Sequence, residues 1–274
     1  MYTTRVMDKL LIGLAAIAAQ VPAALLPFRR TAERANMAFW ALLLVALLGP
    51  SAYVGSQLAG QWHSGLSATL WVSVTASVGL FLLLCVITRE AWRLTPLLLP
   101  YLALLSLIAV IWAHAPAHMR PPMAMNVGGW LLAHIVLSVL TYAFATVAAV
   151  AGAAVFLQER ALKRKRPTRL TAVLPAVADA EFLQVRLLAA AGLVLGIDIL
   201  SGMVVEYFAT GMPIHFEHKP LLSILAFAVI LGLLVLHHRT GMRGRSVARL
   251  VLVAYLLLTL GYPGVKFVTD VLLA

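Results

Sequence analysis

The chain has 274 residues, of which 62% are hydrophobic and 11% are charged. Soluble domains are about half apolar and about a quarter charged, so this composition excludes a soluble globular protein. The net charge is +11, but the Lys and Arg residues lie in short segments between apolar runs, which indicates membrane topology and no nucleic-acid binding. The single cysteine, Cys85, excludes disulfides, CxxC redox sites and Cys-rich metal sites.

Eight apolar runs predict an all-α polytopic membrane helical bundle of about eight transmembrane helices in the lipid bilayer. The runs are Leu10–Phe28, Met37–Ser56, Leu66–Thr88, Leu94–His114, Val127–Leu157, Phe182–Val205, Pro220–Leu236 and Leu250–Leu273. We expect a single integral membrane domain over residues 1–274, with four helices in 1–126 and four in 127–274. No sequence repeat and no soluble domain stands out.

Three segments in chain order carry further expectations. The first run contains Gln20 and Pro22, but three arginines between residues 29 and 34 follow it, which favours a spanning helix over a cleaved signal peptide. The fifth run, Val127–Leu157, is long enough to project beyond the membrane. The segment Pro167–Glu181 is expected to form a short interfacial helix on the cytoplasmic side.

The Lys and Arg residues are distributed unevenly between the two sides of the membrane. Fifteen of the 21 lie in the odd-numbered loops: Arg29, Arg30, Arg34, Arg89, Arg93, Arg160, Lys163, Arg164, Lys165, Arg166, Arg169, Arg239, Arg243, Arg245 and Arg249. Five lie on the opposite side: Arg5, Lys9, Arg120, Lys219 and Lys266. This bias predicts cytoplasmic odd loops and both termini outside, and the protein is expected in the bacterial inner membrane.

Histidines and methionines gather on the outer side or at its boundary. They are His63, His114, His118, His134, His215, His218, Met119, Met123, Met125 and Met212. Imidazole and thioether groups suit haem iron and copper, so a haem or metal site is permitted here. Solvated loop histidines are the plain alternative, except that a polar ring inside an apolar helix, as at His134, needs a partner.

Two charges lie inside apolar runs. Asp198 and Lys266 are each about 16 residues from the cytoplasmic end of their run, or about 24 Å up the helix. At this shared depth they are predicted to form a structural ion pair, because an isolated charge in an apolar setting is costly. A proton or substrate path is the alternative reading.

Four stretches resemble a known family. They are HIVLSVLTYAFATVAAVAGAAVFLQERALKRKR from His134, GLVLGIDILSGMVVEYF over Gly192–Phe208, EHKPLLSILAFAVILGLLVLHHR over Glu217–Arg239, and GYPGVKFVTDVLL over Gly261–Leu273. Together they are similar to cytochrome c assembly proteins of the CcsA/CcmC type, and the last resembles the YpjD-type subgroup. The resemblance covers about residues 127–273, half of the chain.

This resemblance implies haem presentation at the outer face, on a tryptophan-rich loop with external histidines as iron ligands, and cytochrome c maturation proteins as partners. His134 matches the first external histidine, and His237 falls near the family's membrane histidine. The sequence departs from the family at 215–219, where HFEHK replaces the tryptophan motif, and it has no histidine around Gly261–Val265. Either His218 replaces a lost ligand or haem is not bound.

The resulting site hypothesis places His134 and His218 in one outer cavity as axial or near-axial haem ligands. His218 precedes Pro220, which suits the first turn of a helix. Lys219 would pair with a haem propionate, and Tyr142 lies two turns below His134. His215 and His237 complete the candidate cofactor-binding residues.

Two other functions stay open. The outer His and Met residues with Asp198 suit a membrane transporter or metal-efflux accessory protein, and the missing tryptophan motif suits a ligand-free assembly partner. No nucleophile–base pair, phosphate-binding loop or paired carboxylate set appears, so an enzyme is not expected.

The charge bias generates a topology prediction. A reporter that works only in the periplasm should be active when fused after Ala274, and a cytoplasm-only reporter should be silent there. Deletion of the first run should leave the remaining loops on their sides, because the third, fifth and seventh loops still carry basic residues. Activity of the cytoplasmic reporter at Ala274 would contradict the topology.

Overall fold

The computed structural model describes residues 2–29, 35–58, 65–114, 129–211, 218–241 and 244–268. Within these ranges the chain forms helices joined by turns, without a strand. Eight of its helical segments are long and apolar enough to cross a membrane. The predicted all-α polytopic membrane bundle is therefore confirmed.

The helices divide into two compact units, which are described separately. The N-terminal unit comprises Met1–Pro122, Pro167–Pro175 and Asp270–Ala274, and the C-terminal unit comprises Met123–Arg166 and Ala176–Thr269. The expected single membrane domain over residues 1–274 stays a prediction.

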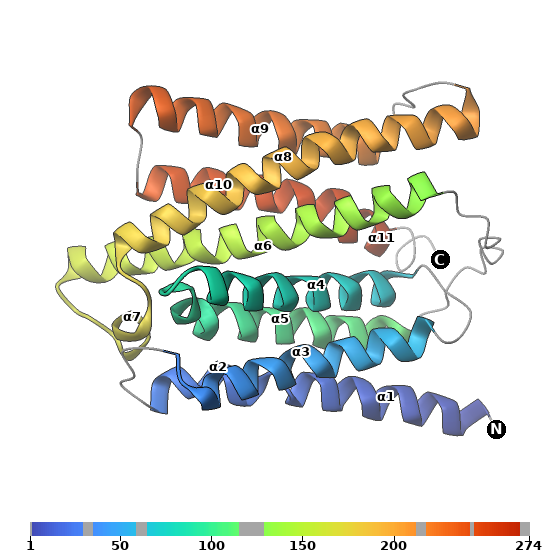
Figure 1. The fold of residues 1–274 in the computed structure, drawn as a ribbon, viewed down its shortest axis with the longest axis horizontal. Coiled ribbons are helices and arrows are strands. Elements are labelled where there is room, and N and C mark those ends of the chain that lie inside the picture. Colours follow the sequence, from blue (N-terminus) through green and yellow to red (C-terminus); the bar gives the residue numbers. More distant parts are fainter. Residues whose placement is uncertain are drawn as a thin grey trace. The chain divides into compact units, whose positions relative to one another are not determined.

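In the N-terminal unit, four spans pack around one core. Its elements are α1 (Tyr2–Ala18), α2 (Val21–Arg29), α3 (Met37–Leu58), α4 (Leu66–Ile87), the 3₁₀ turn η1 (Ala91–Leu94), α5 (Thr95–Ile111), the 3₁₀ turn η2 (Trp112–His114) and the short α7 (Arg169–Val173). The first span, α1 with α2, packs against α3 and α5, and α4 packs against the same two helices (Figure 1). Trp71 and Phe81 on α4 are fully buried in this core.

The first span is broken, where the sequence predicted one continuous run. α1 ends at Ala18 and α2 begins at Val21, because Pro22 has no N–H to donate and its ring would clash with the carbonyl of Ala18 in a continuous helix. Gln20 in the break is fully buried, and its Nε2 donates to Ser106 Oγ on α5 at 3.2 Å. The break thus brings a polar side chain to a partner inside the unit.

In the C-terminal unit, four spans form a closed ring. Its elements are α6 (Gly129–Arg164), α8 (Val177–Thr210), α9 (His218–Thr240), α10 (Arg245–Thr259), the π-helical turn η3 (Leu260–Gly264) and α11 (Val265–Phe267). α6 packs against α8 and α10, and α9 closes the ring by packing against the same two helices (Figure 1). α8 runs opposite to α6, and α9 starts where α8 ends. α6 and α9 thus begin at the same end of the unit, which we call the His134 end.

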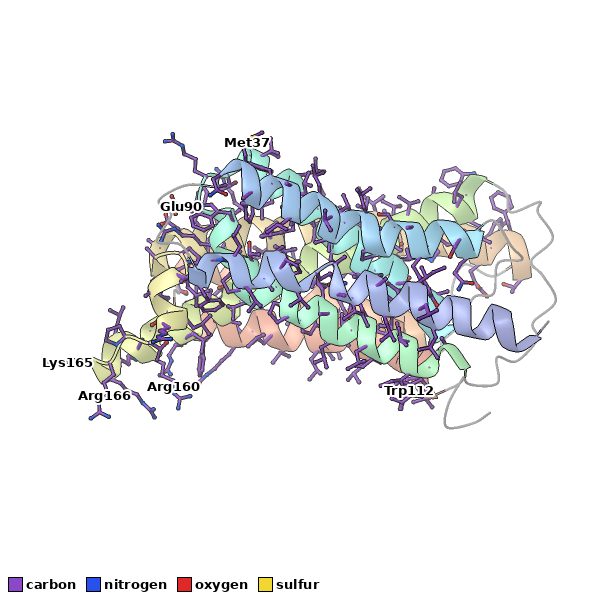
Figure 2. The ribbon with its side chains drawn as sticks, turned by 90° about the horizontal axis from the view of Figure 1, so that it is seen from below. Met37, Glu90, Trp112, Arg160, Lys165 and Arg166 are labelled. Atoms are coloured by element: carbon purple, nitrogen blue, oxygen red, sulfur yellow. The ribbon has the colours of Figure 1, made fainter. Side chains whose placement is uncertain are left out.

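The α6–α8 contact is close because α6 carries small residues along its middle. Ala143, Ala148, Ala151 and Ala154 are fully buried, and small side chains let two membrane helices approach. The 36 residues of α6 span about 54 Å, against a bilayer core of about 30 Å. The helix is therefore long enough to project beyond the membrane, as the sequence predicted, and the basic side chains labelled in Figure 2 lie at its far end.

One connecting segment is shorter than the sequence predicts, and the last span contains a π-helical turn. The expected interfacial helix over Pro167–Glu181 is reduced to the five residues of α7, which begins at a capping box between Thr168 and Thr171. α8 already starts at Val177 and extends the sixth span toward this side. In the last span, Pro263 lies in the π-helical turn η3, since a proline cannot supply the N–H of a regular α-helix.

The packing of α1 on α3 gives a stability prediction. A methyl group at Gly49 would lie 3.0 Å from Ala19 Cβ and 3.1 Å from Ala16 Cα, so Gly49→Ala should push the two helices apart and cost about 1–3 kcal/mol. Gly55→Ala, on the same helix, is the matched control because nothing lies within 4 Å of its new methyl. Thermal unfolding in detergent measures both variants, and equal melting temperatures would contradict the packing.

Candidate functional site

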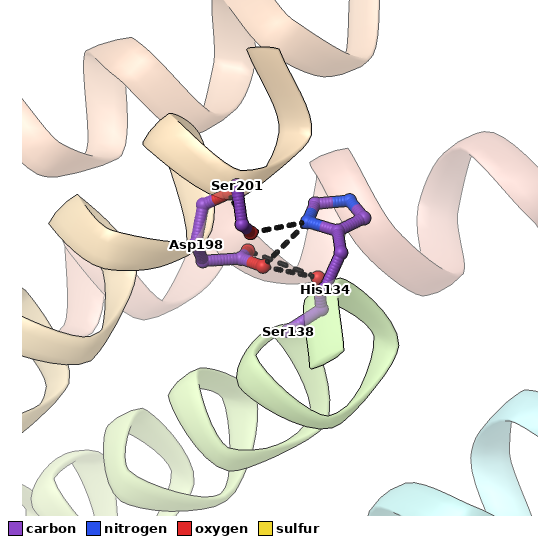
Figure 3. A network of polar contacts seen from close by, with 4 residues as sticks. All are labelled: His134, Ser138, Asp198 and Ser201. Atoms are coloured by element: carbon purple, nitrogen blue, oxygen red, sulfur yellow. Dashed lines mark hydrogen bonds and ion pairs between the residues drawn. The ribbon is translucent and has the colours of Figure 1, made fainter. Parts of the chain in front are cut away.

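A polar network joins α6 and α8 near the His134 end of the C-terminal unit (Figure 3). His134 lies in the second turn of α6 and faces α8. Its Nδ1 is 2.9 Å from Asp198 Oδ1 and 3.0 Å from Ser201 Oγ. Ser138 Oγ donates to the carboxylate, at 2.8 Å from Oδ1 and 2.9 Å from Oδ2 of Asp198.

Helical spacing aligns these four side chains. His134 and Ser138 are four residues apart on α6, and Asp198 and Ser201 are three residues apart on α8, so each pair shares one helix face. The two faces meet where α6 packs on α8. The network is therefore built from two rigid helices and needs no loop to position it.

The hydrogen bonds fix the tautomer of His134. Ser201 Oγ donates its single proton to the backbone carbonyl of Asp198 at 2.8 Å, and Ser138 uses its own on the carboxylate. Nδ1 of His134 must then carry a proton and donate it toward Asp198 Oδ1 and Ser201 Oγ. In the neutral imidazole this leaves the lone pair on Nε2, which is the arrangement of a carboxylate-oriented metal-binding histidine.

Burial makes the carboxylate dependent on these donors. The Asp198 side chain is 11% exposed, whereas the His134 side chain keeps 30% of its surface accessible. A buried carboxylate inside a membrane span is costly without hydrogen-bond donors, and His134 and Ser138 supply them. The network thus buries its acid and leaves the His134 side chain partly exposed.

Gly202 provides the close approach of α8 to the imidazole. A methyl group at this position would lie 3.1 Å from Cε1 and 3.6 Å from Nε2 of His134, so a larger side chain would press on the ring. The backbone of α8 thus lies against one side of the ring and restricts its rotation. An imidazole held in one orientation in this way could serve as a ligand of haem iron.

A second polar cluster lies two turns further along α6. Tyr142 is buried, and its hydroxyl accepts a hydrogen bond from Tyr255 of α10 at 3.0 Å. Thr146 Oγ1 lies 3.2 Å from the Tyr255 hydroxyl, and the ring of Tyr262 lies 5.8 Å from that of Tyr142. Tyr142 therefore contacts α10, whereas His134 contacts α8.

Several predicted site residues are not tested by this geometry. His218 and Lys219 are the first two residues of α9, at the His134 end, but their side chains lie outside the described residues. His63, His118 and His215 also lie outside the described residues, as does the side chain of His114. His237 lies at the other end of α9, with its ring 5.7 Å from that of His238.

The partners of Asp198 differ in part from the sequence expectation. Lys266 lies in α11, and its predicted pairing with Asp198 stays a prediction. Sequence reasoning missed His134, Ser138 and Ser201 as partners of Asp198. Their spacing could have indicated this contact, since Ser138 is one turn from His134 and Ser201 is one turn from Asp198, so each pair lies on one helix face.

Comparisons with known proteins identify relatives along almost the whole chain. Residues 33–273 match the family model described as cytochrome C assembly protein. A protein of Azospirillum brasilense, described as an uncharacterized 28.8 kDa protein in nifR3-like 5'region, is 49% identical over 270 residues, covering 97% of this chain and 99% of that protein. No solved structure matches the chain.

Double-mutant cycles should separate the two candidate partners of Asp198. The His134→Ala and Asp198→Ala pair should show a coupling free energy of about 0.5–3 kcal/mol in thermal or denaturant unfolding, because the side chains share hydrogen bonds. A parallel cycle with Asp198→Asn and Lys266→Met tests the predicted ion pair, which would make the double variant more stable than Asp198→Asn alone. Additive effects in the first cycle would contradict the network.

Proposed function

Because the chain belongs to the cytochrome c assembly protein family, we propose that it binds haem at the outer face of the membrane and presents it during cytochrome c biogenesis. The observation that carries this proposal is the geometry of His134, whose Nδ1 donates toward the buried Asp198 carboxylate and leaves Nε2 for the iron. The role of the family supports the choice of haem among ligands that imidazole can bind.

Asp198 is the positioning residue in this proposal. Its carboxylate holds the imidazole in one tautomer and one orientation and increases the basicity of Nε2, as outer partners of metal-binding histidines do. Ser138 in turn fixes both carboxylate oxygens. His134 would thus ligate the iron from a site that is prepared by α6 and α8.

His218 would be the second residue to hold the haem iron, with Lys219 beside it for a haem propionate. Both residues begin α9 at the His134 end of the unit, which supports this choice. His215, in the preceding segment, is a further candidate ligand. Tyr142 lies below the site, and His237 lies at the opposite end of α9 as the counterpart of the family's membrane histidine.

The proposed orientation places the His134 end outside the bacterial inner membrane. The fifteen Lys and Arg residues of the odd-numbered loops then face the cytoplasm, with both termini outside. Haem bound at His134 would face the compartment in which c-type cytochromes are assembled, and cytochrome c maturation proteins would be the partners on that side.

The test is an absorption spectrum of the purified, detergent-solubilised protein together with cytochrome c yield in cells. The full-length protein should show a Soret band, and His134→Ala and His218→Ala should each weaken or shift it and lower the cytochrome yield. Asp198→Asn should retain the band but change its position, because it keeps the ligand and removes the charge behind it.

His238→Ala is the matched control for these variants. His238 is an exposed histidine at the other end of α9, with its Nδ1 3.0 Å from the carbonyl of Leu234, and its loss should leave the spectrum unchanged. Absence of haem in the full-length protein, with unchanged cytochrome yield in the His134 and His218 variants, would refute the haem proposal and leave the network a structural one.

A further inference from the structure

A row of exposed side chains follows one face of α8. Its members recur at intervals of three or four residues, the spacing of one helix face, and are Phe182, Arg186, Ala189, Leu193, Ile197 and Leu200. Apart from Arg186 the row is apolar, so in a bilayer this face of α8 lies against the acyl chains of lipids. Arg186 is thus a cation on a face that otherwise suits lipid.

Arg186 has no anionic partner within the described part of the chain. Its side chain is exposed, and no described carboxylate forms an ion pair with its guanidinium. Other arginines of the protein lie beside acids: Arg93 Nε is 2.9 Å from Glu90 Oε2, and Arg245 Nε is 3.8 Å from Glu159 Oε2. Charged residues in membrane spans usually face the interior of the bundle, where such partners are available, so the placement of Arg186 calls for a partner outside the chain.

The position of Arg186 along α8 is close to the headgroup level. The 34 residues of α8 span about 51 Å, which exceeds the bilayer core of about 30 Å by about 21 Å. Arg186 lies nine residues, or about 13 Å, from the first residue, Val177, so an equal projection of the helix on both sides places it near the boundary of the acyl chains. The sequence agrees, because Asp179 and Glu181 precede Arg186 and the exposed row after it is uncharged.

The side chain of Arg186 extends toward this boundary. Its Cζ lies 4.2 Å from the centre of the Phe182 ring, and Phe182 is one turn nearer the start of α8. Helical side chains incline toward the N-terminus of their helix, and arginines near the ends of spans extend their charge to the interface in this way. A contact with a ring involves no hydrogen-bond acceptor, so the N–H donors of the guanidinium are left for an anion.

The surrounding charge favours an anionic headgroup. We call the end of the C-terminal unit opposite His134 the basic end. There the last turns of α6 (159–166), the first turns of α8 (177–186), the end of α9 (237–240) and the start of α10 (245–249) hold nine Lys and Arg residues against three acidic residues. This surplus attracts lipids of net negative charge and disfavours zwitterionic lipids, whose headgroups carry a cation of their own.

We propose that Arg186 and Phe182 form a binding site for the phosphate group of an anionic phospholipid in the leaflet at the basic end. The planar guanidinium would donate two N–H groups to two phosphate oxygens, and the ring of Phe182 would hold it in place. The acyl chains would follow the same face of α8 along Leu193 and Ile197, so one row of side chains matches both parts of the lipid. In the orientation proposed above this is the cytoplasmic leaflet, and the site does not depend on haem.

The experiment is native mass spectrometry of the full-length protein in detergent, titrated with dioleoyl phosphatidylglycerol or with dioleoyl phosphatidylcholine. The two lipids have the same acyl chains, and only the first has a net charge. The wild type should bind phosphatidylglycerol more tightly. Arg186→Gln should weaken that binding about fivefold, the effect of one cation near an anionic lipid, and should reduce the preference between the two lipids. Phe182→Leu keeps the charge and an apolar side chain, and should weaken the binding about twofold.

Arg160→Gln is the matched control. Arg160 is also an exposed arginine of the basic end without an ion pair among the described residues, but it lies on the projecting end of α6 (Figure 2). This variant loses the same charge and should keep the wild-type preference. The melting temperature of Arg186→Gln without added lipid should equal that of the wild type, because the side chain is exposed.

Inorganic phosphate tests whether the lipid is required. It should fail to displace phosphatidylglycerol, because it cannot occupy the apolar part of the row. Equal binding of the two lipids by the wild type, an equal loss in Arg160→Gln and Arg186→Gln, or displacement of the lipid by inorganic phosphate would each overturn the proposal.

Discussion

The C-terminal unit depends on one constraint, which is that a carboxylate within a membrane span must find its donors inside the protein. Asp198 meets it through contacts with His134 and Ser138 on the neighbouring helix. The requirement therefore fixes the rotation of α8 relative to α6, because a turn of either helix about its axis would separate the carboxylate from both donors. The same contact determines which nitrogen of His134 is available to a ligand.

Small residues and polar residues have different roles along α6: the small ones allow close packing, and the polar ones form hydrogen bonds across the interface. The buried alanines of its middle bring α8 close, so that short side chains such as Ser138 and Ser201 can reach across the interface. A bulkier interface would keep the helices too far apart for serine hydroxyls to bond to the opposite helix. The site chemistry at one end of α6 is therefore supported by the packing of the segment below it.

Each unit buries a glutamine, and the two side chains differ in their helix context and in their hydrogen-bond partners. Gln20 in the N-terminal unit lies where a proline ends a helix, and the hydroxyl of Ser106 accepts its amide proton. Gln184 in the C-terminal unit lies inside a regular helix, with its amide against a glycine of α6. In the first arrangement the amide nitrogen has partners within the chain, whereas in the second neither amide atom has a hydrogen-bond partner among the described residues.

The sequence by itself determined the class, the number of spans and most of their positions. Hydropathy is a local property, because about 20 consecutive apolar residues suffice to span the bilayer whatever their neighbours are. The sequence also singled out His134 and Asp198, since a polar group in an apolar run is conspicuous before any fold is known. The break at Gln20 was signalled by Pro22, although a continuous run was predicted.

Only the tertiary structure decided which of these groups meet. The sequence predicts an Asp198–Lys266 pair from their shared depth, and that pair stays a prediction, because depth alone does not specify the face of a helix that points toward a neighbour. The structure brings Asp198 to His134 and Ser138, and it brings Tyr142 to Tyr255 on another helix. These contacts depend on which helices are adjacent and how each is rotated, and helix packing sets both through residues far apart in the chain.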